Sequence, residues 1–120
     1  MYTSRYMISA HFRFHGHGSL RYLFKNAQAV RSRYATLKYI ANPKRKAARF
    51  SVVVSKKVHK SAVGRNRIRR RLYEIIRQEQ PRFNGIYDVA IIVTSAEILA
   101  APHEELLESV RDLFARAAMY

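Results

Sequence analysis

Residues 55–77 read SKKVHKSAVGRNRIRRRLYEIIR, and the second half of this stretch predicts an amphipathic helix. Its large apolar residues recur with the 3.6-residue period of an α-helix and form one stripe, which comprises Ile68, Leu72, Ile75 and Ile76. The opposite side is expected to carry Asn66, Arg70, Tyr73 and Arg77, with Arg67, Arg69 and Arg71 on the flanks. The stripe should anchor the helix on a core and leave a guanidinium-rich surface facing out.

Capping and stop signals mark the ends of this helix. Ser61 is the preferred N-cap, because its hydroxyl can accept a hydrogen bond from a free N–H of the first turn. Asn66 is the alternative N-cap, and the pattern leaves this choice open. Gln80-Pro81 should end the helix, since proline cannot continue one.

The arginines of this helix disfavour the helix itself. They crowd its first turns, where the macrodipole favours anions. Arg65–Arg69 and Arg67–Arg71 are like-charge pairs four residues apart, each costing about 0.2–0.5 kcal/mol. A polyanion lying along the helix would turn these repulsions into attraction, whereas the alternative is a merely solvated basic face. We favour the polyanion because the cluster is dense and Glu74 is the only acid near it.

The charge of the whole chain supports the same conclusion. The formal net charge is +15 over 120 residues, and no acid precedes Glu74. Residues 1–82 hold 21 Lys and Arg residues and 2 acids, whereas residues 83–120 hold 2 Lys and Arg residues and 6 acids. Such a field implies a nucleic acid or an anionic membrane as partner. Nucleic acid is the better reading, because a membrane-surface helix needs a wider apolar face than this stripe.

Length and composition limit the class of protein. The length fits a single RNA-binding domain over residues 1–120, with residues 1–18 as a basic-aromatic arm that is flexible or packs partly on the core. Cysteine is absent, which excludes disulfides and thiolate sites and fits a reducing, cytoplasmic location. No apolar run is long enough to cross a bilayer.

The remaining elements predict a small α+β sandwich with helices packed on a sheet. A short helix is expected over about 20–29, with an apolar stripe of Leu20, Leu23, Phe24 and Ala27. Strands are expected over 33–40, 49–55 and 86–94, and the turn at Asn42-Pro43 should make the first two antiparallel. A last helix should begin near Pro102 and bury Leu106, Val110, Leu113, Phe114 and Ala117.

Neither a side-chain active site nor a metal site is predicted. The only acids before residue 83, Glu74 and Glu79, do not form a natural acid–base pair. His59 and His103 have no evident partner, so an autonomous two-histidine ribonuclease is a minor alternative. RNA binding is better supported, because cations grip the backbone and aromatics stack on bases. For Phe24 we expect core packing rather than stacking, and the pattern leaves both roles open for Tyr22, Tyr34 and Tyr39.

One stretch resembles a known family. Ser55-Lys56-Lys57, followed by AVGRNRIRR at residues 62–70, is similar to the signature of the protein subunit of bacterial ribonuclease P. That signature is a strand ending in a basic Ser/Ala-Lys-Lys, a short loop, and a helix that opens with Arg-Asn-Arg and further cations. The other expected elements, from the Arg13-Phe14 arm to the last helix, fall in the order of that family.

The resemblance implies a subunit of a ribonucleoprotein endonuclease that removes the 5′ leader of precursor tRNA. In that family the RNA subunit holds the catalytic Mg²⁺ ions and the protein assists, so the implied partners are ribonuclease P RNA and precursor tRNA. Neither a membrane nor a protein oligomer is implied. The residues implied to dock on the catalytic RNA are Lys56, Lys57, Lys60, Arg65, Asn66, Arg67, Arg69 and Arg70.

The resemblance also implies a cleft for the single-stranded leader, between the first helix and the sheet. Its wall would draw on Leu20, Tyr22, Phe24, Tyr34, Thr36 and Lys38. The family often has an aromatic residue where Leu20 stands, so Tyr22 or Tyr34 would have to supply stacking there. The implied fold is ribosomal-protein-like, with a left-handed β-α-β crossover. The alternative function is a ribosomal or general RNA-binding protein without a processing role.

Overall fold

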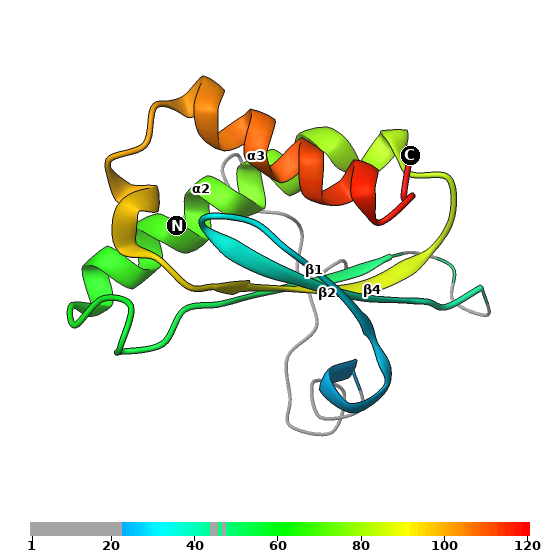
Figure 1. Cartoon of the computed structure of the whole chain (residues 1–120), viewed down its shortest axis with the longest axis horizontal. Helices are drawn as coiled ribbons and strands as arrows, with labels where there is room; N and C mark the ends of the chain where they lie inside the picture. Colours follow the sequence, from blue (N-terminus) through cyan, green and yellow to red (C-terminus); the bar gives the residue numbers. More distant parts are fainter. Residues whose placement is uncertain (1–22, 44–45, 47) are drawn as a thin grey trace.

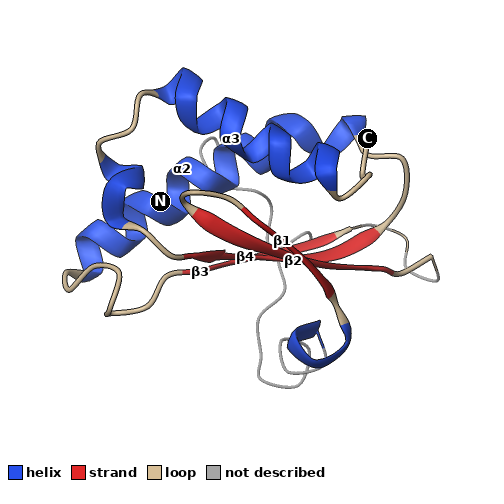
Figure 2. Ribbon diagram, viewed as in Figure 1, coloured by secondary structure: helices blue, strands red, loops and turns tan. Residues whose placement is uncertain are grey.

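The chain folds into a four-stranded mixed sheet with two long helices on one of its faces (Figures 1 and 2). The computed structural model describes residues 23–43, 46 and 48–120. The predicted arm over residues 1–18, and the predicted leader residues Leu20 and Tyr22, lie outside the described residues. The arrangement confirms the predicted α+β class.

The sheet places the last strand of the sequence in its interior. The strands are β1 (Gln28–Arg31), β2 (Ala35–Ala41), β3 (Arg49–Val53) and β4 (Tyr87–Val93). Their order is β1-β2-β4-β3, with β4 antiparallel to β2 and parallel to β3, and β1 antiparallel to β2. Each predicted strand is thus present, with bounds that differ by one or two residues.

β2 and β3 run in opposite directions, as the turn at Asn42-Pro43 predicted, but they do not pair with each other. β4 lies between them because five of its seven residues are buried, which suits a strand covered on both faces and both edges. The β3–α2–β4 unit, in which α2 spans Ala62–Glu79, therefore joins neighbouring parallel strands. Its left-handed crossover remains an expectation from the resemblance.

The prediction of a helix over 20–29 was wrong in its second half. Residues 23–26 are helical, but Gln28–Arg31 form β1, which pairs with Thr36–Tyr39 of β2. The tight turn between β1 and β2 is closed by Ser32, whose Oγ accepts the N–H groups of Tyr34 and Ala35, at 3.3 Å each. These pairing partners, rather than the local apolar period, determine the conformation of residues 28–31.

The N-cap and the apolar stripe of α2 are as predicted. Ser61 is the N-cap and its side chain accepts the N–H of Gly64. Ile68, Leu72, Ile75 and Ile76 are fully buried against the sheet. The helix ends at Glu79, and the 3₁₀ turn η3 (Gln80–Arg82) follows it. The stripe therefore fixes which side of α2 faces out.

Tyr73 does not lie on the outward side of α2, so that prediction was wrong. Its side chain is buried, and its hydroxyl accepts the N–H of Val52 at 3.0 Å. Val52 belongs to β3, which lies at the edge of the sheet and has no second neighbouring strand among the described residues. A buried N–H needs an acceptor, and Tyr73 supplies one.

The last helix, α3 (His103–Arg116), packs beside α2 on the same face of the sheet (Figure 2). Pro102 is its N-cap and Glu104 and Glu105 lie in its first turn. All five residues of the predicted stripe are buried: Leu106, Val110, Leu113, Phe114 and Ala117. The 3₁₀ turn η4 (Ala96–Leu99) connects β4 to α3. No helix in the described part of the chain is long and apolar enough to cross a membrane.

Candidate nucleic-acid interface

The eight residues predicted to dock on RNA gather in the turn before α2 and in its first turns. Six of them are exposed: Lys56, Lys57, Lys60, Asn66, Arg67 and Arg70. Arg65 and Arg69 are partly buried, and Arg69 donates a hydrogen bond to Oδ1 of Asn66 at 2.7 Å. We call these eight residues the docking surface. The structure brings them together, because the three lysines lie in the turn that leads directly into α2 and the buried stripe of α2 leaves the other five residues on its outer sides.

The turn before α2 is closed by a set of local hydrogen bonds. The N–H groups of Val58 and His59 donate to the carbonyl of Ser55, at 3.1 and 3.3 Å. Nη1 of Arg65 donates to the carbonyls of His59 and Lys60, at 3.0 and 2.8 Å. Arg65 therefore holds the turn as well as adding charge to the docking surface.

No acid belongs to the docking surface, and Glu74 is the only acid between residues 55 and 77. Glu74 is bonded to Arg77 at 2.5 Å, so its carboxylate is already shared with a cation outside the docking surface. Arg67 makes no ion pair within residues 23–43, 46 and 48–120. The first turn of α2 holds no acid. The helix start therefore presents a positive surface to a polyanion.

Arg71, which the sequence placed on the flank of α2 with Arg67 and Arg69, has a structural role. Its Nη1 donates to the carbonyl of Ile98, and its Nη2 donates to the carbonyl of Ala101 at 2.8 Å. The guanidinium ties α2 to the segment that leads into α3. Sequence reasoning missed this role because residues 98–101 carry no local sign that they face α2.

The predicted leader residues divide between the two faces of the sheet. Lys38 and Thr36 alternate with Leu37, whose side chain is buried under the helices, so they face the other way. The short helix at residues 23–26 lies on this second face (Figure 1), where Leu23 packs with Ala90. We call this second face, with Phe24, Thr36 and Lys38, the open face, because the two long helices lie on the other one (Figure 2).

Phe24 is exposed rather than packed in the core, so the expectation for its side chain was wrong. It is 40% exposed, and Nζ of Lys38 lies 5.4 Å from its ring centroid. The same Nζ donates to the carbonyl of Phe24 at 3.4 Å. Proteins that bind single-stranded nucleic acids combine aromatic rings, on which bases stack, with cations that contact the phosphates.

Tyr34 does not join Phe24 and Lys38. It is buried in the core beneath the helices, and its hydroxyl donates to Oε1 of Glu105 on α3 at 3.0 Å. Tyr39 also packs against that core and donates to Oε1 of Gln28 at 2.9 Å. The structure thus commits both tyrosines to packing on the helix side.

The two histidines in the described part of the chain, His59 and His103, lie in different surroundings. Nδ1 of His59 accepts the N–H of Ser61 at 3.1 Å, so this atom is already engaged in the turn. His103 lies at the start of α3, in a hollow that it shares with Arg70, Arg71 and Glu74. The two rings belong to different elements with different neighbours.

The described residues do not fit a protein-held Mg²⁺ ion. Mg²⁺ needs several oxygen ligands, and no cluster of three acids or histidines occurs in this part of the chain. Asp88 illustrates why: both of its oxygens accept hydrogen bonds from Arg49, at 2.9 Å each.

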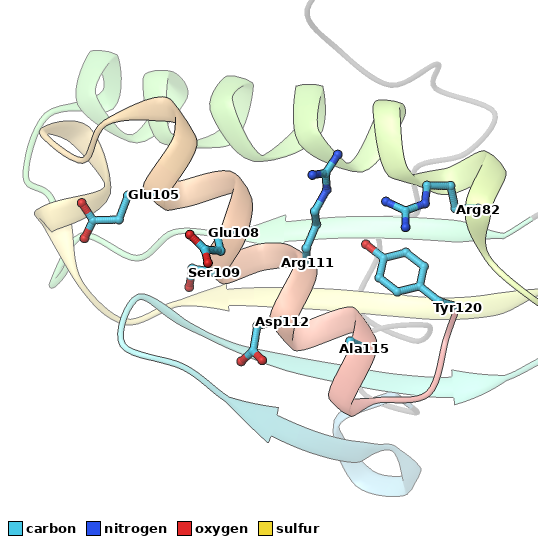
Figure 3. A pocket seen from close by; sticks show the side chains of 8 residues that line it. All are labelled: Arg82, Glu105, Glu108, Ser109, Arg111, Asp112, Ala115 and Tyr120. Carbon is cyan, nitrogen blue, oxygen red and sulfur yellow. The ribbon is translucent and has the colours of Figure 1, made fainter.

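A hollow of about 630 Å³ is lined mostly by residues of α3, together with Arg82 and Tyr120 (Figure 3). Arg82 and Tyr120 stand together at one end, with the Arg82 Cζ 4.6 Å from the tyrosine ring centroid. The acids along it are Glu105, Glu108 and Asp112. This mixed charge makes the hollow a poor site for RNA.

Buried Glu79 joins Arg82, Arg111 and Tyr120 at that end of the hollow. It accepts hydrogen bonds from Arg82 at 2.9 Å, Arg111 at 3.0 Å and the Tyr120 hydroxyl at 2.7 Å. Burial alone would raise the pKa of this carboxyl, but the hydrogen bonds and the two guanidinium charges outweigh it and lower the pKa. Burial and the bond to Glu79 in turn raise the pKa of Tyr120.

Comparison with known proteins identifies the family. The family model described as Ribonuclease P matches residues 8–118 of the chain. A ribonuclease P protein component from Pseudanabaena sp. is 31% identical over 96 residues, which cover 79% of this chain and 81% of that protein. One from Synechocystis sp. is 36% identical over 72 residues, 60% of this chain; the match spans 57% of that relative's length.

Solved structures agree on the fold. The RNase P protein from Staphylococcus aureus superposes with a TM-score of 0.80 at 19% identity, over 91% of this chain and 97% of that one. The RNase P protein from Thermotoga maritima gives a TM-score of 0.73 at 22% identity, over 81% of this chain and 89% of that one. Since the family model covers nearly the whole chain, the chain belongs to the bacterial ribonuclease P protein component family.

Proposed function

We propose that this protein is the accessory subunit of a ribonuclease P, which binds the catalytic RNA and assists Mg²⁺-dependent removal of the 5′ leader from precursor tRNA. The observation that carries the proposal is the docking surface, a dense group of cations turned outward by the buried stripe of α2. Phosphate contacts from such a surface supply most of the affinity for a nucleic acid. The RNA subunit, rather than this chain, would hold the Mg²⁺ ions.

The open face is proposed to receive the leader. Phe24 and Lys38 support this role, because one is an exposed ring and the other an ammonium group beside it. Thr36 lies on the same face and would border the leader. Tyr34 is left out of this proposal, since its ring and hydroxyl are committed to the helix side.

The function is tested by cleavage of a precursor tRNA with bacterial ribonuclease P RNA at low Mg²⁺, with and without the protein. We expect the protein to lower the Mg²⁺ concentration that cleavage requires and to be inactive without the RNA. An unchanged Mg²⁺ requirement would contradict the proposal. Cleavage by the protein alone would favour an autonomous ribonuclease instead.

The leader role is tested with Phe24→Ala and Lys38→Ala in the reconstituted complex. Each variant should bind precursor tRNA several-fold more weakly, because Phe24→Ala loses a stacked base, worth about 1–3 kcal/mol, and Lys38→Ala loses a phosphate contact. Binding of mature tRNA, which has no leader, should be unchanged. An equal loss for both tRNAs would place these residues away from the leader.

A further inference from the structure

The ring of His59 lies directly against the backbone of Gly64 at the start of α2. A Cβ atom built on Gly64 would stand 2.2 Å from Cε1, 2.3 Å from Nδ1 and 2.6 Å from Nε2 of that ring. Nonbonded carbons prefer a separation of about 3.5–4.0 Å, so no side chain fits at position 64 while the ring is there. Glycine is therefore needed here for close approach, because the backbone is an ordinary α-helix.

The same ring holds the turn through a hydrogen bond. Nδ1 of His59 accepts the N–H of Ser61 at 3.1 Å, and Oγ of Ser61 accepts the N–H of Gly64 at 3.3 Å. A side-chain acceptor that bonds the N–H two residues on stabilises a turn, as Asn and Asp do in Asx turns. One hydrogen bond and one packing contact thus fix residues 59–61 against the helix start.

Arg65 depends on this geometry. Its Nη1 bonds the carbonyls of His59 and Lys60, so the position of the guanidinium follows that of the turn. The three N–H donors on its Nε and Nη2 have no partner among the residues that the structure describes. They are free to meet a phosphate.

We propose that His59 and Gly64 form an interlocked pair that positions the turn and the Arg65 guanidinium for RNA, so that His59 sets RNA affinity without touching RNA. The proposal rests on the proposed function, because it takes this region as the docking surface. A loop already held in its bound geometry loses less entropy on association. Breaking the pair should therefore weaken binding and leave the rate of the bound complex unchanged.

The first experiment separates the two contacts of the ring. His59→Asn keeps an acceptor for the Ser61 N–H and removes the ring, whereas His59→Ala removes both. Val63→Ala is the control, since Val63 is the neighbouring helix residue and is 64% exposed. For each variant we would measure the Kd for ribonuclease P RNA, the cleavage rate at saturating protein, and the thermal unfolding midpoint.

We expect His59→Ala to raise the Kd about fivefold to tenfold, the equivalent of a lost hydrogen bond and some packing. His59→Asn should raise it less, and Val63→Ala should leave it within about twofold. The saturated rate should stay at the parent value throughout. An unchanged Kd for His59→Ala would show that His59 does not affect RNA binding. A lower cleavage rate at saturating protein would show that His59 affects the cleavage step. Either result overturns the proposal.

The second experiment tests the contact itself with a double-mutant cycle of Gly64→Ala and His59→Gly. Alanine favours a helix over glycine, so in the His59→Gly background Gly64→Ala should raise the unfolding midpoint by about 4 °C. In the parent this gain should vanish or reverse, because the new Cβ displaces the ring. Additive effects would show that the ring and Gly64 do not touch, which contradicts the proposal.

The two experiments also separate this inference from the proposed function. If the parent fails to bind ribonuclease P RNA, the proposed function fails, while the stability cycle still decides whether the interlocked pair exists. If the parent binds and the variants bind equally well, only the inference fails.

Discussion

Arg70 and Arg71 are neighbours in the sequence with different surroundings in the structure. Arg70 is exposed on the docking surface, whereas Arg71 is half-buried and donates to two main-chain carbonyls of the segment before α3. Their charge and size are identical, so a difference between their alanine variants reports the surroundings alone.

Arg71→Ala should lower the free energy of unfolding by about 1–3 kcal/mol, because the carbonyls of Ile98 and Ala101 lose their donors. Arg70→Ala should change it by less than about 0.5 kcal/mol, as is usual at exposed positions. Arg70→Ala should instead weaken RNA binding several-fold. Urea unfolding and RNA binding of both variants check this, and the reverse pattern would contradict the assignment.

Glu79 predicts a pH dependence of stability. Its folded pKa lies below the ordinary value, so its contribution is present above the unfolded pKa of about 4.5 and is lost as the pH falls through the folded pKa. Glu79→Gln should cost about 2 kcal/mol of unfolding free energy at pH 7, because three donors lose a charged acceptor. The difference from the parent should shrink below about pH 4.5.

Denaturant unfolding at several pH values measures this difference, with Glu108→Gln as control on the exposed side of α3. Glu108 lines the hollow but is exposed, so its variant should follow the parent at every pH. A Glu79→Gln difference that is constant with pH would show that the charge of this carboxyl contributes nothing.

At the scale of elements, Tyr73 joins α2 to the edge of the sheet. Its hydroxyl is the acceptor for the buried N–H of Val52 on β3. The bond also covers part of an edge that could otherwise pair with another chain. Helix and edge strand are thus held by a polar contact in addition to the apolar stripe.

Tyr73→Phe removes that acceptor and keeps the ring. It should lower the free energy of unfolding by about 1–3 kcal/mol, since a buried N–H is left unsatisfied. The Kd of the folded variant for RNA should be unchanged, because the hydroxyl bonds to β3 rather than lying on the docking surface. Urea unfolding together with RNA binding tests both parts, and an unchanged stability would mean that water replaces the hydroxyl.

Elements with a strong local signal were predictable from the sequence, and those defined by partners were not. α2 and α3 carry complete apolar stripes with caps, and β4 is a long apolar run. β1 has only four residues and exists through its pairing with β2. The position of β4 between β2 and β3 likewise depends on packing over both faces, which no local pattern encodes.

The same division applies to the candidate site. That these cations gather at the start of α2 was predictable from their run in the sequence, and their contact with RNA stays a prediction. The role of Arg65 in holding the turn depends on the local fold of that turn. The separation of Tyr34 from Phe24 depends on contacts between residues that are far apart in the sequence. The sequence could predict neither. In the sequence, Gly64 is only one residue of the AVGRNRIRR stretch at residues 62–70. Its contact with the ring of His59 is visible only in the structure.

At the scale of the whole molecule, charge is divided between surfaces. The turn and the start of α2 are positive, whereas three exposed acids of α3 line the hollow of Figure 3: Glu105, Glu108 and Asp112. Arg33 spans from the β1–β2 turn to Glu97 at 2.8 Å, so part of the remaining positive charge is neutralised within the fold. A polyanion would therefore approach from the side of the docking surface.

The most direct test is the rate of leader cleavage by ribonuclease P RNA at low Mg²⁺ with the double variant Arg67→Ala/Arg70→Ala, followed as protein concentration rises. The account predicts a slow rate at low protein and recovery to the parent rate at saturation, because the variant keeps the buried stripe of α2 and loses phosphate contacts. A rate equal to the parent at every concentration, or one that never recovers, would contradict the docking surface as the site of RNA binding.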